Sequence, residues 1–268
     1  MLLLNDFIAE VKPLLEETLE ELIPLVGSPL FEAASYSLEE GKRLRPLLTL
    51  AVVSTFDQSL EAALHPTCAL ELIHTYSLIH DDLPCMDDDD IRRKKPSLHK
   101  AYSESTAVLT GDFLLTLAFE VLANAPDITS EQKLKLISCL SQRAGEKGMI
   151  GGQVLDIAYQ GNFDSLTTLV DTHRKKTGAL FKAAFEFGAI LCNQPLETFQ
   201  EMGDHLGLAY QIVDDLLDQD GIISMLGEEK TSEWASTLHE KTLLAIQKLD
   251  RPAPILEQLA TYLIFRNV

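Results

Sequence analysis

The sequence predicts an all-α protein, and three observations support that prediction. Its 268 residues are 46% hydrophobic, which is enough to bury one large core. Leu, Ala and Glu dominate, and only 14 Gly and 11 Pro are spread through the chain, a composition that favours helices over sheet. Apolar residues recur at helical spacing, whereas the alternation typical of strands is scarce. We therefore expect one domain spanning residues 1–268, folded as a helical bundle.

The expected helices follow from the apolar periodicity and from the breaks between periodic segments. Thr129 or Ser130 is a candidate N-cap, and Pro46 stands where a first helical residue tolerates proline. Short turns such as "CNQPLE" separate the segments. In chain order the expected helices are 5–32, 33–41, 46–56, 60–83, 104–124, 130–147, 165–191, 196–218 and 233–265.

Charge and cysteine content narrow the possible functions. A formal net charge of −19 argues against nucleic acid as a partner, because phosphate backbones are bound by excess Lys and Arg. The four cysteines, Cys68, Cys85, Cys139 and Cys192, lie far apart without CxxC spacing, as expected of reduced structural residues in a cytoplasmic protein. No run of eighteen uninterrupted apolar residues occurs, and the first helix lacks a basic signal region, so we expect no transmembrane segment.

Two aspartate clusters directly follow long apolar helical runs. The first lies in "IHDDLPCMDDDDIRRKK" at 79–95, and the second is "DDLLD" at 214–218. On a helix, Asp214 and Asp218 share a face, where their repulsion is unfavourable without a cation. Isolated acidic runs are usually solvated surface, but here both clusters end buried helices. Carboxylates without imidazole or thiolate partners suit Mg²⁺, which completes its coordination with water and substrate phosphate.

Basic residues accompany the acidic ones. Arg92 and Arg93 follow the first cluster, and "GKRLRP" at 41–46 places Lys42 and Arg45 beside a helix start. Such a helix start favours anions, and arginine binds phosphate in a fork geometry. Surface ion pairs are the ordinary alternative and contribute little. The combination predicts two phosphate sites, one bridged by metal and one bound directly.

These motifs resemble the ordered blocks of a known family. "GKRLRP", "DDLPCMD", "GMIGGQVLDIAYQG", "HRKKTGALF" and "YQIVDDLLD" are similar to those of the short-chain trans-prenyl diphosphate synthases, over about two-thirds of the chain. The resemblance implies about ten or more helices around a central cavity. It also implies condensation of isopentenyl diphosphate with an allylic diphosphate, three Mg²⁺ ions per active site, and a homodimer.

The resemblance also implies roles for individual residues. The metal ligands would be Asp81, Asp82 and Asp87 in the first cluster and Asp214, Asp215 and Asp218 in the second. Isopentenyl diphosphate would be bound by Lys42, Arg45, His74 and Arg93, and the allylic diphosphate by Arg92 and Lys176. Thr177 and Gln211 would stabilise the carbocation. Asp88, Asp89 and Asp90 match no ligand position, and His80 and His99 could both be structural.

Two residues are expected to set product length. Tyr76 lies five residues before Asp81 on the same helix, with Ser77 one turn before Asp81, so the phenol would form the floor of the pocket about 7 Å from the metals. By resemblance an aromatic residue there is similar to the farnesyl diphosphate synthases, and a smaller one to the geranylgeranyl synthases. The alternative is that Tyr76 only packs the core. We favour a fifteen-carbon product, with geranylgeranyl or geranyl diphosphate as the alternatives.

The sequence departs from the family pattern after the second cluster. Here "DQDGIISMLGEEKTSEW" contains neither the Gly-Lys pair nor the Tyr-Pro of the family's flexible lid, and the segment is shorter than the pattern. Either the lid is truncated, or a stretch near 228–231 is absent from the sequence, which is the interpretation we favour. We therefore assign no lid lysine.

Three other functions compete. A ferritin-like di-iron bundle would use paired Glu-x-x-His motifs, and "ELIH" at 71–74 is one, without a second copy. A class I terpene cyclase would carry Asn, Ser and Glu in its second metal motif where this chain has "DDLLD". An inactive regulatory subunit of the same fold is the non-enzymatic alternative, which the intact aspartate clusters disfavour.

Overall fold

A computed structural model describes residues 2–23 and 28–265 of the chain, and it confirms the all-α prediction. Two antiparallel two-residue strands, β1 (Ile91–Arg92) and β2 (Lys95–Pro96), form the sheet of the described residues. The helices are α1 (Leu2–Leu22), α2 (Pro29–Leu38), α3 (Leu44–Thr55), α4 (Leu60–Asp81), α5 (Leu98–Ala101), α6 (Glu104–Asn124), α7 (Ser130–Ala144), α8 (Met149–Tyr159), α9 (Leu166–His173), the π-helix η1 (Arg174–Gly178), α10 (Ala179–Leu191), α11 (Glu197–Asp218), α12 (Ile222–Leu226), α13 (Glu228–Gln247) and α14 (Pro254–Ile264).

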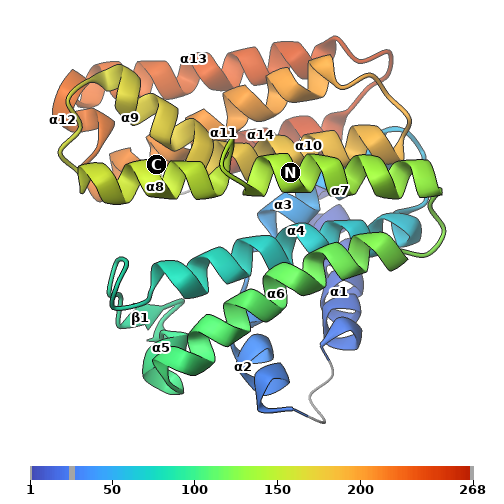
Figure 1. Ribbon diagram of the computed structural model, residues 1–268. Helices are drawn as coiled ribbons and strands as arrows, with labels where there is room; N and C mark the ends of the chain where they lie inside the picture. Colours follow the sequence, from blue (N-terminus) through green and yellow to red (C-terminus); the bar gives the residue numbers. More distant parts are fainter. Residues whose placement is uncertain (1, 24–27, 266–268) are drawn as a thin grey trace.

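The core lies where α3, α4, α10 and α11 pack together. Every residue of α10 except Lys182 is buried, which explains why this helix reads as a nearly continuous apolar run. Figure 1 shows α4 and α6 side by side below a second group of helices that contains α8, α10, α11 and α13. The carboxyl end of α4 belongs to the first group, and the π-helix η1 packs on α8 and α11 of the second group. The two therefore approach the same region from different sides.

Local sequence signals explain several helix boundaries. Thr129 caps α7 in a capping box with Gln132, and α6 spans the predicted 104–124. Leu44, rather than Pro46, is the first residue of α3. The predicted helix 5–32 is wrong at its end: α1 stops at Leu22 and Ser28 caps a new helix that begins at Pro29, while residues 24–27 lie outside the described part.

Other elements were not predicted. The expected helix 233–265 is two helices, because Pro252 and Pro254 interrupt the backbone hydrogen bonding between α13 and α14. α5, α8, α12 and the β1–β2 hairpin were also absent from the expected elements. Residues 228–231, where we expected a missing segment, form the start of the uninterrupted helix α13. The absence of a lid stretch from this place stays a prediction.

The four cysteines are free thiols, as expected. Cys68 and Cys192 are buried and Cys139 is partly buried, whereas Cys85 is exposed in the turn after α4. By length and composition, α6 is the helix of the described residues that could cross a bilayer, and 44% of its apolar window is buried inside the fold. Core helices of globular proteins meet the same criteria.

Candidate active site

A cavity of about 570 Å³ lies among α3, α4, α6, α8 and η1. One part of its wall is apolar, with side chains from α6 and α8, and another part is polar. Polar residues that lie far apart in the chain, between positions 45 and 177, meet in this cavity. The predicted site residues among them are Arg45, His74, Tyr76, Ser77, Asp81, Lys176 and Thr177. A cavity lined by both apolar and charged side chains suits an amphipathic ligand.

Asp81 is the first-cluster carboxylate that lines this cavity. Burial raises the pKa of Asp81 to about 6, and the nearby Lys176 opposes that shift. Asp87 and Asp82 raise the pKa further, so the three carboxylates of the motif lie close enough to repel one another. No hydrogen bond to the Asp81 side chain occurs within the described residues, which leaves its oxygens available to a ligand.

The π-helix presents Lys176 and Thr177 to the cavity. Widened helical turns of this kind are common at functional sites, because they shift side chains out of the regular helical face. Close packing of α8 fixes the position of the π-helix: a Cβ at Gly152 would lie 2.1 Å from the Lys176 backbone nitrogen. Lys176 Nζ pairs with Asp156 on α8 at 2.5 Å. Glycine at 152 is therefore needed for this arrangement.

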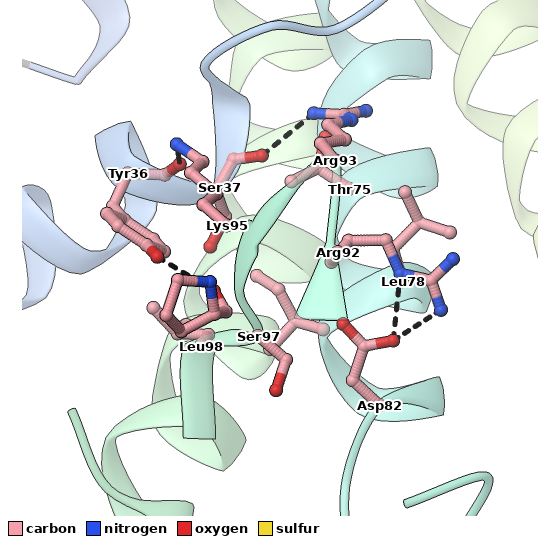
Figure 2. Close-up of a pocket in the computed structure, with 12 residues that line it drawn as sticks. Tyr36, Ser37, Thr75, Leu78, Asp82, Arg92, Arg93, Lys95, Ser97 and Leu98 are labelled. Carbon is pink, nitrogen blue, oxygen red and sulfur yellow. Dashed lines mark hydrogen bonds and ion pairs between the residues drawn. The ribbon is translucent and has the colours of Figure 1, made fainter. Parts of the chain in front are cut away.

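Asp82 lies on the other side of α4 and is held by Arg92. It is 2% exposed, and the Arg92 Nε donates to its Oδ1 at 2.9 Å (Figure 2). Burial raises the pKa of Asp82 and the Arg92 hydrogen bond lowers it. Arg92 also donates to the exposed Asp89 at 2.9 Å. Arg92 thus ties the first cluster to the hairpin, with its guanidinium beside the carboxylates.

A cationic corner surrounds His74. Burial, followed by the charges of Arg45, Arg93, Arg43 and Arg92, lowers the pKa of His74 well below 6.5, so this imidazole is neutral. Arg45 is 9% exposed, lies over the Phe181 ring at 5.0 Å, and its Nε has no hydrogen-bond partner among the described residues. A buried guanidinium with an unused donor is suited to an anion. Lys42, just before α3, is exposed.

The corner is held in place by Glu71, which the sequence analysis considered only as part of a di-iron motif. Glu71 is 1% exposed and accepts from Arg43 Nη1 at 2.8 Å, while Arg93 Nη2 lies 3.9 Å away. Arg93 also donates to the Ser37 carbonyl at 2.9 Å (Figure 2). Arg43 has a φ of 54°, and a Cβ at Gly41 would collide with its guanidinium. A glutamate inside the apolar run of α4 was the signal for this hub.

The second cluster is connected to the cavity through Gln211. Thr177 Oγ1 donates to Gln211 Oε1 at 2.7 Å, and Gln211 Nε2 donates to Asp215 Oδ1 at 3.1 Å. Asp215 is 3% exposed, and its Oδ2 lies 3.0 Å from His173 Nε2 and accepts from the Ile222 amide at 2.9 Å. Both oxygens are engaged, so Asp215 positions Gln211 and the start of α12; a ligand role for it stays a prediction.

The other predicted ligands of this cluster are placed less centrally. The charge of Asp214 raises the pKa of Arg45, although burial has a larger and opposite effect. The Asp214 carboxylate therefore lies near the cavity wall that Arg45 forms. Asp218, at the end of α11, and Asp87, in the loop after α4, are exposed. The structure therefore gathers the first cluster, Lys176 and the arginines, and brings the second cluster near through Gln211 and Asp214.

Tyr76 and Ser77 both line the cavity below Asp81. Tyr76 is 5% exposed, stacks edge-on against His80 at 5.8 Å, and its hydroxyl has no partner among the described residues. Burial, then the charge of Asp81, raises the pKa of Tyr76 to about 12. The Ser77 hydroxyl is bound to the His74 carbonyl at 2.9 Å.

Three polar residues of the cavity region had no predicted role. Asp156 pairs with Lys176 and affects the pKa of Asp87, and it is the only charged residue of α8. Gln153 lines the cavity with both amide atoms buried and unpartnered among the described residues, and Asp112 lines it from α6. A lone charge in an apolar helix was the available signal for Asp156.

Comparison with known proteins was made by sequence and by structure. A family model described as polyprenyl synthetase matches residues 28–261. The farnesyl diphosphate synthase of Bacillus subtilis (strain 168) is 41% identical over 238 residues, covering 86% of this chain and 80% of its own length. A crystal structure of a FPP/GFPP synthase from Zymomonas mobilis superposes with a TM-score of 0.93 at 38% identity, covering 98% of this chain and 99% of that one.

A plant relative shows a difference in length. The chloroplastic geranylgeranyl pyrophosphate synthase of Capsicum annuum is 38% identical over 289 residues, covering 97% of this chain and 78% of its own length. The aligned length exceeds the 268 residues of this chain. The plant protein therefore contains residues, within the aligned region, that this chain lacks.

Proposed function

This chain belongs to the polyprenyl synthetase family, and from that membership we propose that it is a trans-prenyltransferase. It condenses isopentenyl diphosphate with dimethylallyl or geranyl diphosphate and yields farnesyl diphosphate, with geranylgeranyl or geranyl diphosphate as the alternative products. The observation that carries the proposal is the cavity, which is lined by carboxylates, cations and apolar side chains together. A di-iron bundle, by contrast, has no support from the matching family.

Asp81, Asp82 and Asp87 would hold Mg²⁺, with Asp214, Asp215 and Asp218 as the second set. The oxygen-only donors of the first cluster fit this hard ion, and the free oxygens of Asp81 point to a ligand from outside the chain. When bound, the ion neutralises the charge that develops on the departing diphosphate. Three ions per site, as the family resemblance implies, is part of the proposal.

The cations divide between the two substrates. Lys176 and Arg92 lie beside the first cluster, where they would bind the allylic diphosphate. Arg45, Arg93 and His74, together with the exposed Lys42, would bind isopentenyl diphosphate. Neutral His74 serves as a hydrogen-bonding group there, because the surrounding arginines disfavour its protonation.

Thr177 and Gln211 would stabilise the allylic cation. The Thr177 hydroxyl donates its proton to Gln211, so the oxygen lone pairs remain for the cavity. Gln211 in turn donates to the buried carboxylate of Asp215, which polarises the chain of hydrogen bonds toward Thr177. The homoallylic double bond attacks the cation, forming the new carbon–carbon bond, and the resulting cation loses a proton to the released diphosphate.

A single incubation tests the proposal. The protein, isopentenyl diphosphate, geranyl diphosphate and Mg²⁺ are combined, and the products are separated by chain length. We expect farnesyl diphosphate as the main product; a main product of twenty carbons would reassign the chain as a geranylgeranyl synthase, and ten carbons from dimethylallyl diphosphate as a geranyl synthase. No condensation with any allylic diphosphate would favour the regulatory-subunit alternative.

We also propose a cytoplasmic homodimer. The free thiols are consistent with a reducing compartment. On α6, Val108 and Leu109 are 40% and 59% exposed, although the helix is apolar along most of its length. A second copy of the chain would cover this face. Sedimentation analysis should give twice the monomer mass of 29.7 kDa, and Leu109→Lys should shift it toward the monomer.

A further inference from the structure

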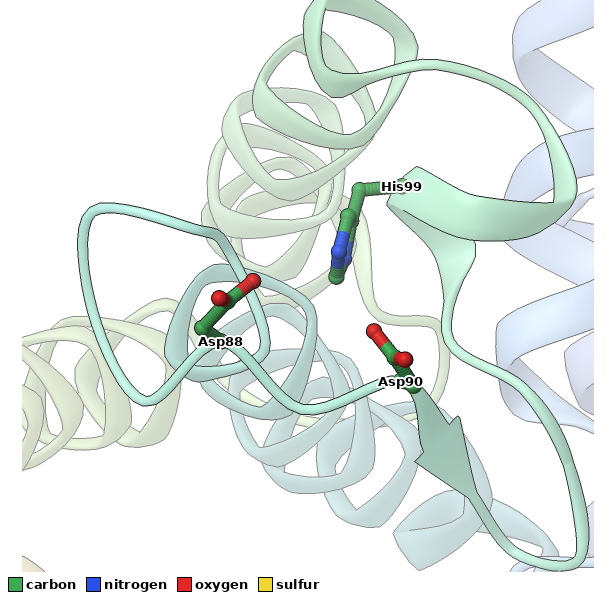
Figure 3. A group of neighbouring side chains, drawn as sticks. All are labelled: Asp88, Asp90 and His99. Carbon is green, nitrogen blue, oxygen red and sulfur yellow. The ribbon is translucent and has the colours of Figure 1, made fainter.

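A group of possible metal ligands that differs from both aspartate clusters of the proposed active site lies outside the cavity. Asp88 and Asp90 belong to the loop after α4, and His99 lies on the short helix α5. One ligand atom of each residue lies within 4.8 Å of the others, and Figure 3 shows the imidazole beside the two carboxylates. We propose that Asp88, Asp90 and His99 bind a first-row transition-metal dication, with Zn²⁺ preferred.

His99 provides the observation that distinguishes this cluster from an ordinary acidic surface. The residue is only 7% exposed, and its Nε2 has no hydrogen-bond partner within the described residues. A buried nitrogen that lacks a hydrogen-bond partner is unfavourable, because it has lost its contact with water. The other ring nitrogen, Nδ1, lies 3.1 Å from Ser97 Oγ. When Nδ1 carries the proton and donates to Ser97, the Nε2 lone pair is free to bind a metal.

The donor set selects a different metal from the one proposed for the cavity. Asp81, Asp82 and Asp87 offer carboxylate oxygens alone, as Mg²⁺ prefers. Asp88, Asp90 and His99 instead combine two carboxylates with an imidazole. Imidazole nitrogen suits zinc and its neighbours in the first transition row. Millimolar Mg²⁺ should therefore occupy the oxygen-only site without competing strongly at His99.

The backbone around the cluster is fixed, but the carboxylates can move. The Ser97 amide donates to the Asp90 carbonyl at 3.0 Å, which holds the loop against the start of α5. Ligand atoms around a tetrahedral zinc ion lie about 3.5 Å apart, and those of the three residues lie within 4.8 Å of one another, so the largest separation needs to shorten by at most about 1.3 Å. Asp88 and Asp90 are exposed and can rotate to do this. Lys100 competes for the site, because its Nζ lies 2.8 Å from Asp90 Oδ1.

An ion at this site would connect α5 to the part of the loop that follows Asp87. Asp88 directly follows Asp87 in the chain and is held by a hydrogen bond from its amide to the Leu83 carbonyl at 3.1 Å. The ion would therefore stiffen the segment after α4. The inference itself does not depend on the proposed prenyltransferase activity, because it rests on the three side chains alone.

Equilibrium dialysis against micromolar Zn²⁺ with millimolar Mg²⁺ tests the site, with bound zinc measured by mass spectrometry on protein without a histidine tag. We expect one zinc ion per chain, and at least a roughly 100-fold weaker affinity in His99→Asn. Because the buried His99 variant could unfold, Asp90→Asn provides a surface variant that should lose zinc in the same way. Lys100→Gln should bind zinc more tightly than the native chain.

Asp89→Asn is the matched control, since Asp89 belongs to the same aspartate run but pairs with Arg92 instead of joining the cluster. It should retain the zinc ion. Anomalous diffraction at the zinc edge should place the peak among Asp88, Asp90 and His99. The proposal fails if the native chain binds no zinc, if Asp90→Asn binds as tightly as Asp89→Asn, or if the peak lies only at Asp81 or elsewhere.

Discussion

Replacing Tyr76 with alanine tests how the cavity limits product length. The ring lines the cavity and is 5% exposed; if it forms the floor, as we propose, a longer chain can grow only by displacing it. Forcing extra carbon atoms into a packed wall costs about 1–3 kcal/mol, which corresponds to a roughly 5- to 150-fold bias against the longer product. Tyr76→Ala should remove that bias, and products beyond fifteen carbons should rise by that factor.

The stability cost of this variant should be modest. Truncating a buried aromatic residue usually costs about 3–5 kcal/mol. Part of the Tyr76 ring already faces a cavity, however, and its unpartnered hydroxyl is removed with it, so we expect about 2 kcal/mol. Tyr76→Phe is the matched control: it keeps the ring, should leave product length unchanged, and should be as stable as the native chain or more so.

Products from isopentenyl and geranyl diphosphates are separated by chromatography, and unfolding is followed by calorimetry. Ser77→Phe adds a ring one residue nearer Asp81, one helical turn before it, and should shorten the product instead. If Tyr76→Ala still yields only the fifteen-carbon diphosphate, or if Tyr76→Phe lengthens the product as much as alanine does, the ring does not form the floor of the cavity.

Three further predictions concern a buried ion pair, the packing of α8 against the π-helix, and the protonation of His74. Burial would raise the pKa of Glu186, but Arg143 donates to it and holds that pKa below 4.5; the pair therefore stabilises the fold above about pH 4.5, and this contribution is lost as pH falls. In Arg143→Met the free energy of unfolding at pH 7 should drop by about 3 kcal/mol, and adding Glu186→Gln should recover most of it; equal stability of the single and double variants would contradict this. Gly152→Ala places a methyl group 2.1 Å from the Lys176 nitrogen, so melting temperature and condensation rate should both fall, whereas unchanged values would show that α8 can move freely. His74 should stay neutral between about pH 5.5 and 8 in NMR titration; a midpoint near 6.5 would mean that the arginines do not surround it.

Local sequence signals predicted the helices well where a helix carries its own boundary residues. The span 104–124 and the Thr129 cap were found because apolar periodicity and capping are properties of adjacent residues. The helix 5–32 and the helix 233–265 were predicted too long, although Pro29 and Pro254 mark the new starts. Apolar periodicity continues across such breaks, because successive helices bury their faces against the same core.

The sequence by itself determined the all-α class, the two aspartate clusters and the cations beside them, because spacing along one helix decides which side chains share a face. Only the tertiary structure decided which of these charges meet. Asp156 reaches Lys176 from another helix, Glu71 gathers Arg43 and Arg93, and Asp215 is engaged by His173 and the Ile222 amide. Such contacts depend on how helices far apart in the chain pack, which no local pattern specifies.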